Sequence, residues 1–181
     1  MKRKILIGVA GLVALLVVLG LWVVFVGNKR SPAQTLSFNQ AGLELKLSYC
    51  RPFKKGRVIF GEKSADALVP FGHYWRLGAN AATELTLSKK ASFAGKPVEA
   101  GSYRMYAIPG AKTWKVVLNT DLGRWGAGEA DHAKDLLTVE VPVDAAAETE
   151  QFTISFTGEP AAARMDFVWD KTAVHVPIAP L

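Results

Sequence analysis

The sequence predicts an all-β fold, an antiparallel β-sandwich with Greek-key or jelly-roll-like connections, preceded by one N-terminal transmembrane helix. Three observations lead to this prediction. An unbroken apolar stretch runs from Ile5 to Val26. Beyond it, apolar and polar residues alternate with a period of two in several short segments, and glycines between them mark frequent turns. We therefore divide the chain into an anchor, residues 1–30, and a single extracytoplasmic domain, residues 31–181.

The N-terminal apolar stretch is long enough to cross a lipid bilayer. The 22 residues from Ile5 to Val26 carry no charge, amide or hydroxyl group. As a helix they would extend about 33 Å, against a hydrocarbon core of ~30 Å. The alternative, a cleaved signal peptide, has a shorter apolar run and a small-x-small cleavage site. This run is longer and is not followed by Ala-x-Ala, so we expect an uncleaved anchor with the lipid bilayer as its partner.

Basic residues on both sides of the anchor predict its orientation. Residues 2–4 (Lys-Arg-Lys) and the α-amino group precede it, whereas Lys29 and Arg30 follow it. Because the cytoplasmic flank carries the excess of positive charge, the N-terminus is expected in the cytoplasm. The predicted localisation is the cytoplasmic (inner) membrane, crossed once, with residues 31–181 in the periplasm or outside the cell.

The basic character of the chain comes mostly from the anchor. Of 22 Lys and Arg residues, five flank the apolar stretch, which leaves 17 against 16 Asp and Glu, or +1, for residues 31–181. Nucleic acid is therefore not an expected partner, since its binding needs a clustered basic surface. The single cysteine, Cys50, allows no intrachain disulfide and does not indicate a redox compartment.

The domain begins with a polar tether, Asn28 to Ala33, and continues as short strands separated by turns. Pro109-Gly110 predicts a turn that joins two strands in a hairpin. One short helical turn is expected within Glu129 to Leu137. The segments expected as strands are Leu43 to Tyr49, Leu85 to Leu87, Tyr103 to Ile108, Trp114 to Leu118, Leu136 to Val143, Phe152 to Phe156, Arg164 to Trp169 and Thr172 to Ile178.

The sequence carries no motif of a known catalytic or cofactor site. Gly-x-Ser-x-Gly, P-loop, dinucleotide-binding and His-Glu-x-x-His patterns are absent. The three histidines, His73, His132 and His175, lie far apart without a neighbouring pair of metal ligands. We therefore predict no catalytic residue, no metal and no cofactor.

Two segments rich in Arg, aromatic and Gly residues form the candidate ligand site. A guanidinium offers a rigid fork of donors to a carboxylate or phosphate, and an aromatic side chain can wall a pocket for an anionic or sugar ligand. Alternatively, the arginines tie loop carbonyls together and the asparagine hydrogen-bonds its own turn. The candidate residues are Arg51, Arg57, Trp75, Arg76 and Asn80.

Trp125 is a further candidate for ligand binding. Gly123 and Gly126 flank it and predict a tight loop. Such a loop either packs the indole against the domain or presents it to a ligand.

These segments resemble a bacterial family catalogued as domain of unknown function 2911. The resemblance covers nearly all of residues 33–178 and implies an exported or envelope-associated protein, without an activity, cofactor or catalytic residue. In two positions the chain differs from many relatives: Ala81 stands where Glu is common, and Cys50 where Ser is usual. If that Glu serves a reaction in relatives, this chain lacks it. The resemblance rests on Tyr49-Cys50-Arg51-Pro52, Gly56-Arg57, Ile59-Phe60-Gly61, Leu68-Val69-Pro70-Phe71-Gly72, Trp75-Arg76 and Gly78-Ala79-Asn80.

The expected function is that of a membrane-anchored extracytoplasmic module that binds a small ligand or an envelope partner. An alternative is an envelope hydrolase or isomerase that acts on a sugar or anionic metabolite with Arg76, Asn80 and a histidine. A general base must come within ~2.6–3.2 Å of its proton, directly or through one water, so this alternative needs a histidine or carboxylate in the same pocket as Arg76. A third alternative is a purely structural envelope protein.

Overall fold

The computed structural model describes residues 11–22, 30–125 and 128–181. Residues 11–22 form a helix within the predicted anchor, Ile5 to Val26, and the rest of that stretch lies outside the described residues. Among the described residues, no helix combines the length and the apolar character that crossing a membrane requires.

The domain is built on one antiparallel sheet, which in the described residues has nine strands in the order β1-β2-β5-β8-β9-β10-β11-β6-β7. A separate parallel pair joins β3 (Phe60–Gly61) to β4 (Val69–Pro70), and 3-10 helices lie at Lys63–Ala65 and His132–Lys134. The strands of the main sheet are β1 (Ala33–Gln40), β2 (Leu43–Cys50), β5 (Thr83–Leu87), β6 (Ala91–Phe93), β7 (Lys96–Val98), β8 (Gly101–Pro109), β9 (Thr113–Asn119), β10 (Asp135–Gly158) and β11 (Ala163–Pro180).

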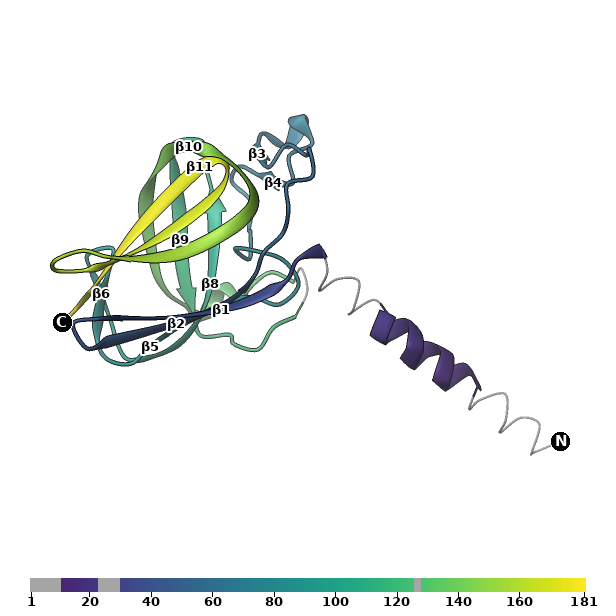
Figure 1. Ribbon diagram of the computed structural model, residues 1–181, viewed down its shortest axis with the longest axis horizontal. Coiled ribbons are helices and arrows are strands. Elements are labelled where there is room, and N and C mark those ends of the chain that lie inside the picture. The colour runs from purple at the N-terminus through teal and green to yellow at the C-terminus, as the bar shows by residue number, and fades with distance from the viewer. Residues whose placement is uncertain (1–10, 23–29, 126–127) are drawn as a thin grey trace.

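The sheet folds back on itself because β10 passes from one layer to the other (Figure 1). Its residues 135–142 pair with β9, whereas residues 143–158 pair with β11. Register shifts between Ala145 and Thr153 mark irregularities that let this long strand bend. Where the layers meet again, Phe38 of β1 stacks on Phe156 of β10 with 5.7 Å between ring centroids. The all-β, sandwich-like fold is thus as predicted.

The strand order combines a run of sequential neighbours with one long crossing. From β8 to β11, consecutive strands are neighbours, as in a meander. Only the β6–β7 hairpin crosses to the far edge, where β6 pairs with β11. Short connections, residues 110–112 and 159–162, keep β8 beside β9 and β10 beside β11.

The expected strands are present with wider limits. β10 and β11 each join two of them into one strand. β1 is not among the expected strands. Its side chains are exposed or half-buried, so its apolar residues form only a weak alternating pattern. The helical turn expected within Glu129 to Leu137 is present as a 3-10 helix at His132–Lys134. It is shorter than the expected segment because β10 begins at Asp135.

Aromatic side chains from both layers fill one end of the core. Trp75 stacks on Trp169 with 5.8 Å between ring centroids, and Phe152 meets Trp75 edge-on at 4.9 Å. Phe60 packs on Trp114 at 5.1 Å. Such ring pairs contribute ~0.5–1.5 kcal/mol beyond the burial of their area. This aromatic cluster fixes the long connection between β2 and β5, which carries Phe60 and Trp75, against the sheet.

Phe152→Ala should lower the free energy of unfolding by about 3–5 kcal/mol, because it leaves a cavity among Tyr49, Trp75 and Trp169. Denaturant unfolding of the full chain in a non-ionic detergent, followed by tryptophan fluorescence, measures this loss. Leu136→Ala, at a side chain that is 54% exposed, is the control and should change the free energy by no more than ~0.5 kcal/mol. Similar losses for both variants would contradict the assignment of Phe152 to the core.

Candidate functional site

A cleft of about 760 Å³ opens beside the point where the chain enters β1. Its lining comes from residues 30–31, 52–57, 68–69 and 74–80, together with Trp169 of β11. Three of these four segments belong to the long connection between β2 and β5 of the main sheet, as is usual for binding sites on a rigid scaffold.

The cleft is strongly cationic. Arg30, Lys55, Arg57 and Arg76 line it, and no Asp, Glu or His belongs to its lining in the part of the chain that the structure describes. Like charges gathered around one hollow without a counter-charge attract an anion.

The backbone of residues 74–80 is held in place by hydrogen bonds of Trp75 and by the close approach of Gly78 to β2. Trp75 exchanges two backbone hydrogen bonds of 2.8 Å with Ala107 of β8, and its indole Nε1 donates to the Gly78 carbonyl at 3.3 Å. Gly78 has a φ of +148°, and a Cβ there would lie 2.6 Å from the Cys50 carbonyl oxygen. Glycine at this position therefore allows the segment to lie against the end of β2.

Arg76 follows Trp75 and is half-buried in the wall of the cleft. Its Nε is buried and has no hydrogen-bond partner among the described residues. Burial lowers the pKa of Arg76 from its ordinary value, whereas the nearby Tyr74 and Cys50 oppose this shift. A guanidinium that is partly desolvated and not paired with a described carboxylate is suited to an anionic ligand.

The two other predicted arginines are placed differently. Arg57 lines the cleft and donates to the carbonyl oxygens of Lys54 at 2.9 Å and Phe53 at 2.5 Å, so it also braces its own loop. Arg51 lies outside the cleft lining and donates to Phe152 O at 3.3 Å and Thr153 Oγ1 at 2.9 Å. Arg51 thus ties the end of β2 to β10.

The structure also separates Asn80 from Trp125. Asn80 lines the cleft, and its Nδ2 donates to the Ser31 carbonyl at 3.3 Å. Trp125 is outside the cleft lining and is 63% exposed, but its backbone pairs with Ala81 next to Asn80. The cleft therefore unites Arg57, Trp75, Arg76 and Asn80, while Trp125 lies on a neighbouring loop.

Behind the cleft lies a buried ion pair that our sequence analysis missed. Arg104 of β8 is 1% exposed, and its Nη1 lies 3.5 Å from Asp121 Oδ2. Its Nη2 donates to the Gly128 carbonyl at 2.8 Å and to the Tyr74 hydroxyl at 2.5 Å. Because Tyr74 lines the cleft, it connects the cleft to this pair.

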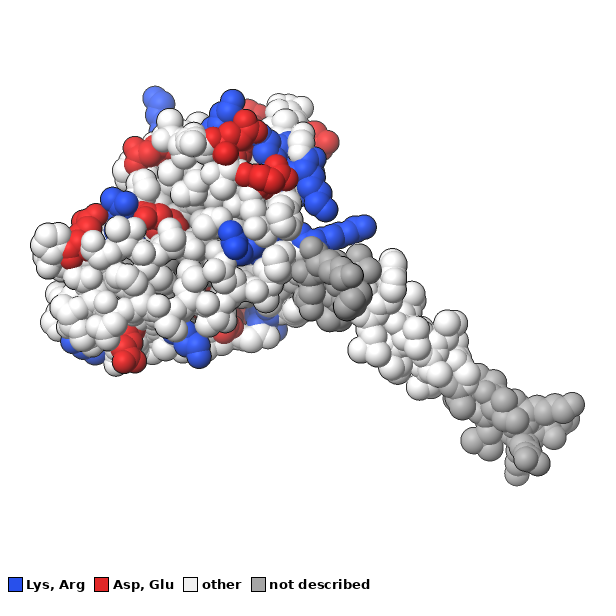
Figure 2. All heavy atoms as spheres, in the orientation of Figure 1, with Lys and Arg blue, Asp and Glu red and all other residues white. Residues whose placement is uncertain are grey.

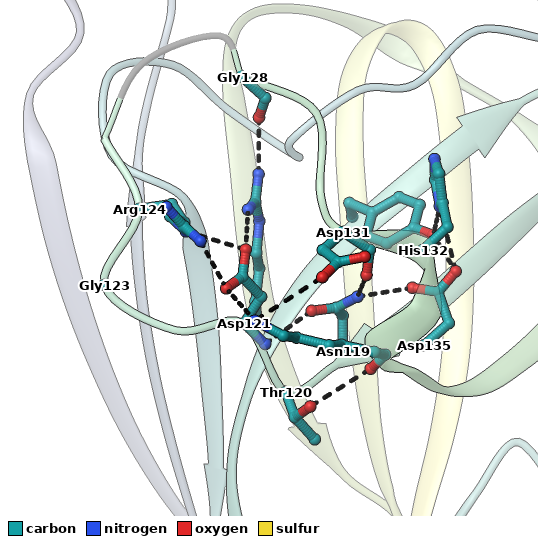
Figure 3. A network of polar contacts seen from close by, with 12 residues as sticks. Asn119, Thr120, Asp121, Gly123, Arg124, Gly128, Asp131, His132 and Asp135 are labelled. Atoms are coloured by element: carbon teal, nitrogen blue, oxygen red, sulfur yellow. Dashed lines mark hydrogen bonds and ion pairs between the residues drawn. The ribbon is translucent and has the colours of Figure 1, made fainter.

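Asp121 is the centre of a wider polar network (Figure 3). Arg124 binds it through two hydrogen bonds of 2.9 Å, and Lys134 donates to it at 3.1 Å. The hydrogen bonds from Arg124 and Lys134 lower the pKa of Asp121 from 3.8 to about 2. The carboxylate is therefore charged at neutral pH and balances the buried Arg104.

A second part of the network joins Tyr106, His132 and Asp135. The Tyr106 hydroxyl donates to Asp135 Oδ2 at 2.7 Å and lies 2.9 Å from His132 Nδ1. Burial raises the pKa of Tyr106. Burial alone would raise the pKa of Asp135 too, but hydrogen bonds from Asn119 and Tyr106 bring it below its usual value. These groups hold the loop between β9 and β10.

The histidines do not meet at the cleft. His132 belongs to the network just described, and His175 pairs with Asp166 at 2.5 Å on β11. His73 is exposed and does not line the cleft. Within the described ranges, no group of three or more His, Cys, Asp or Glu residues is arranged to hold a metal ion.

Comparison with known proteins identifies a family. A family model described as a protein of unknown function, DUF2911, matches residues 31–178. This confirms the resemblance drawn from the Arg- and Trp-rich segments. No curated protein and no solved structure matches the chain.

Asp121→Asn should flatten the acid limb of the stability curve. The folded protein holds the pKa of Asp121 at about 2, below the ordinary 3.8, so the ionised carboxylate stabilises the fold above that range. This stabilisation is lost as the pH falls from 3.8 through about 2. The variant should lack that change and be less stable at neutral pH, because Arg104 loses its buried counter-charge.

Denaturant unfolding at a series of pH values measures this effect. Asp66→Asn, in an exposed loop, is the matched control and should keep the wild-type pH dependence. An acid limb that is as steep in Asp121→Asn as in the wild type would contradict the role given to Asp121.

Proposed function

The chain belongs to the DUF2911 family of proteins of unknown function, and on that premise we propose that it is a membrane-tethered module whose cleft binds a small anionic ligand. The observation that carries this proposal is the lining of the cleft: four cationic side chains and, among its described residues, no carboxylate. A structural cluster of this kind would normally contain counter-charges, because unpaired cations brought together repel one another.

The side chains suit a phosphate or carboxylate group attached to a small organic body. Arg76 offers a planar fork of donors. Lys55 adds an exposed point charge, and so does Arg57, whose Nε and Nη2 donate to its own loop. Tyr74 and Trp75 supply an apolar wall for the uncharged part of the ligand.

The tether is part of the same proposal. The apolar stretch from Ile5 to Val26 would span the bilayer, with the N-terminus in the cytoplasm and the sandwich in the periplasm or outside the cell. The helix of residues 11–22 supports a helical form for part of that stretch.

No observation favours the alternative of a hydrolase or isomerase that uses Arg76, Asn80 and a histidine. Arg76 and Asn80 do line one cleft, but the described lining contains neither a histidine nor a carboxylate to act as general base. The binding function needs no such group.

Arg76→Gln should weaken the binding of inorganic phosphate by at least about tenfold, because a hydrogen bond to a charged group contributes ~1.5–3 kcal/mol. Isothermal titration calorimetry of the full chain in a non-ionic detergent measures the affinity, with a neutral hexose as the comparison ligand. Lys115→Gln removes an equal charge from an exposed side chain of β9, outside the cleft, and should bind phosphate as the wild type does. Equal affinities in Arg76→Gln and the wild type, or binding of the hexose alone, would contradict an anion site.

A further inference from the structure

We infer that the anion held in the cleft is the phosphate of a lipid headgroup in the bilayer to which the chain is tethered. This rests on the proposed function and names the ligand of the same site. It combines the position of the cleft next to the tether, the charge of its lining and the exposed apolar side chains beside it.

The tether places the cleft at the membrane surface. Arg30 and Ser31 line the cleft, and only five residues lead from Val26, the last residue of the apolar stretch, to Ser31. Five residues span at most about 18 Å when fully extended. The headgroup region is ~5–8 Å thick on each side of the hydrocarbon core, so the rim of the cleft stays within reach of lipid phosphates. A tether this short also raises the effective concentration of headgroups at the site.

The charges near the cleft complement an anionic lipid surface. Lys55 and Arg57 are exposed on the loop that lines one wall, and Arg30 lies at the entry of the chain. On the right-hand side of the domain in Figure 2, basic side chains project from below the lobe that carries β3 and β4. The acidic residues of that lobe, Glu62 and Asp66, do not line the cleft.

Exposed apolar side chains accompany these charges. Leu68 lines the cleft and is 44% exposed, and Val58, whose carbonyl accepts from the Leu68 amide, is 51% exposed. Trp125 is 63% exposed, and its backbone pairs with Ala81 beside the cleft residue Asn80. Indoles and aliphatic side chains next to Arg and Lys are typical of surfaces that rest in the membrane interface. The lipid interpretation therefore explains an exposed tryptophan that the ligand cleft alone does not use.

Hydrogen exchange of the full chain in lipid nanodiscs tests the inference. One set of discs contains phosphatidylcholine, and the other an equimolar mixture of phosphatidylcholine and phosphatidylglycerol. In the anionic discs, amides of residues 53–57 and 74–80 should exchange more slowly by about fivefold or more, the factor that one basic side chain contributes at an anionic surface. High salt should reduce the difference. Inorganic phosphate, added to the neutral discs, should protect the same amides.

Two double variants separate the cleft from the rest of the chain. Arg57→Gln/Arg76→Gln should lose the protection by anionic lipid, whereas Lys90→Gln/Lys115→Gln, with the same net charge, should keep it. Both control lysines are exposed and lie outside the cleft. If the first variant does not fold, Lys55→Gln replaces it, and its exposed side chain should give a smaller loss in the same direction.

Each other outcome overturns the inference. Protection by phosphate but not by anionic lipid would overturn the lipid ligand and leave the anion site intact. Protection by neither would overturn both proposals. Protection by anionic lipid that survives Arg57→Gln/Arg76→Gln or Lys55→Gln would place lipid binding on the basic flanks of the anchor instead of the cleft.

Discussion

The cleft exists because the indole of Trp75 is fixed in the aromatic end of the core. Trp75 stacks on Trp169, meets Phe152 edge-on and exchanges backbone hydrogen bonds with Ala107. These contacts anchor the long connection between β2 and β5 in the part that approaches β5, so that Arg76 and Asn80 lie at the wall of the cleft. Stacking, backbone pairing and the close approach of Gly78 to Cys50 all act on this one segment. The site is therefore carried by the core, although its residues belong to a connection.

A buried cation behind the site adds to its positive potential. Arg104 reaches Tyr74 from inside the sheet, and its charge opposes ionisation of Arg76. Asp121 neutralises Arg104, but Asp121 is also bound by Arg124 and Lys134. Lys134 also pairs with Asp131 at 3.8 Å, so the cation that lies directly behind the wall formed by Tyr74 is the buried Arg104.

The sequence predicts those features of this protein that depend on residues close together in the chain. The period-two pattern is enough to place most strands. Of the six residues that the Arg- and Trp-rich segments suggest, Arg57, Trp75, Arg76 and Asn80 line one cleft, whereas Arg51 and Trp125 do not. The Arg104–Asp121 pair depends on the register of β8 against β9, in which Arg104 lies opposite Asn119, and no local pattern gives that register. The sequence does offer one clue to this pair, because Arg104 lies inside the otherwise apolar strand Tyr103 to Ile108. The crossing of the β6–β7 hairpin is equally non-local, since each of its strands has only three residues.

We propose that the cationic cleft is an anion site, and crystallography with a heavy oxyanion can locate the bound anion. Crystals of the protein soaked in tungstate should show an anomalous peak in the cleft, with its oxygens about 2.7–3.2 Å from the guanidinium of Arg76. An empty cleft, with tungstate bound only to exposed lysines elsewhere on the sheet, would show that the cleft is not an anion site.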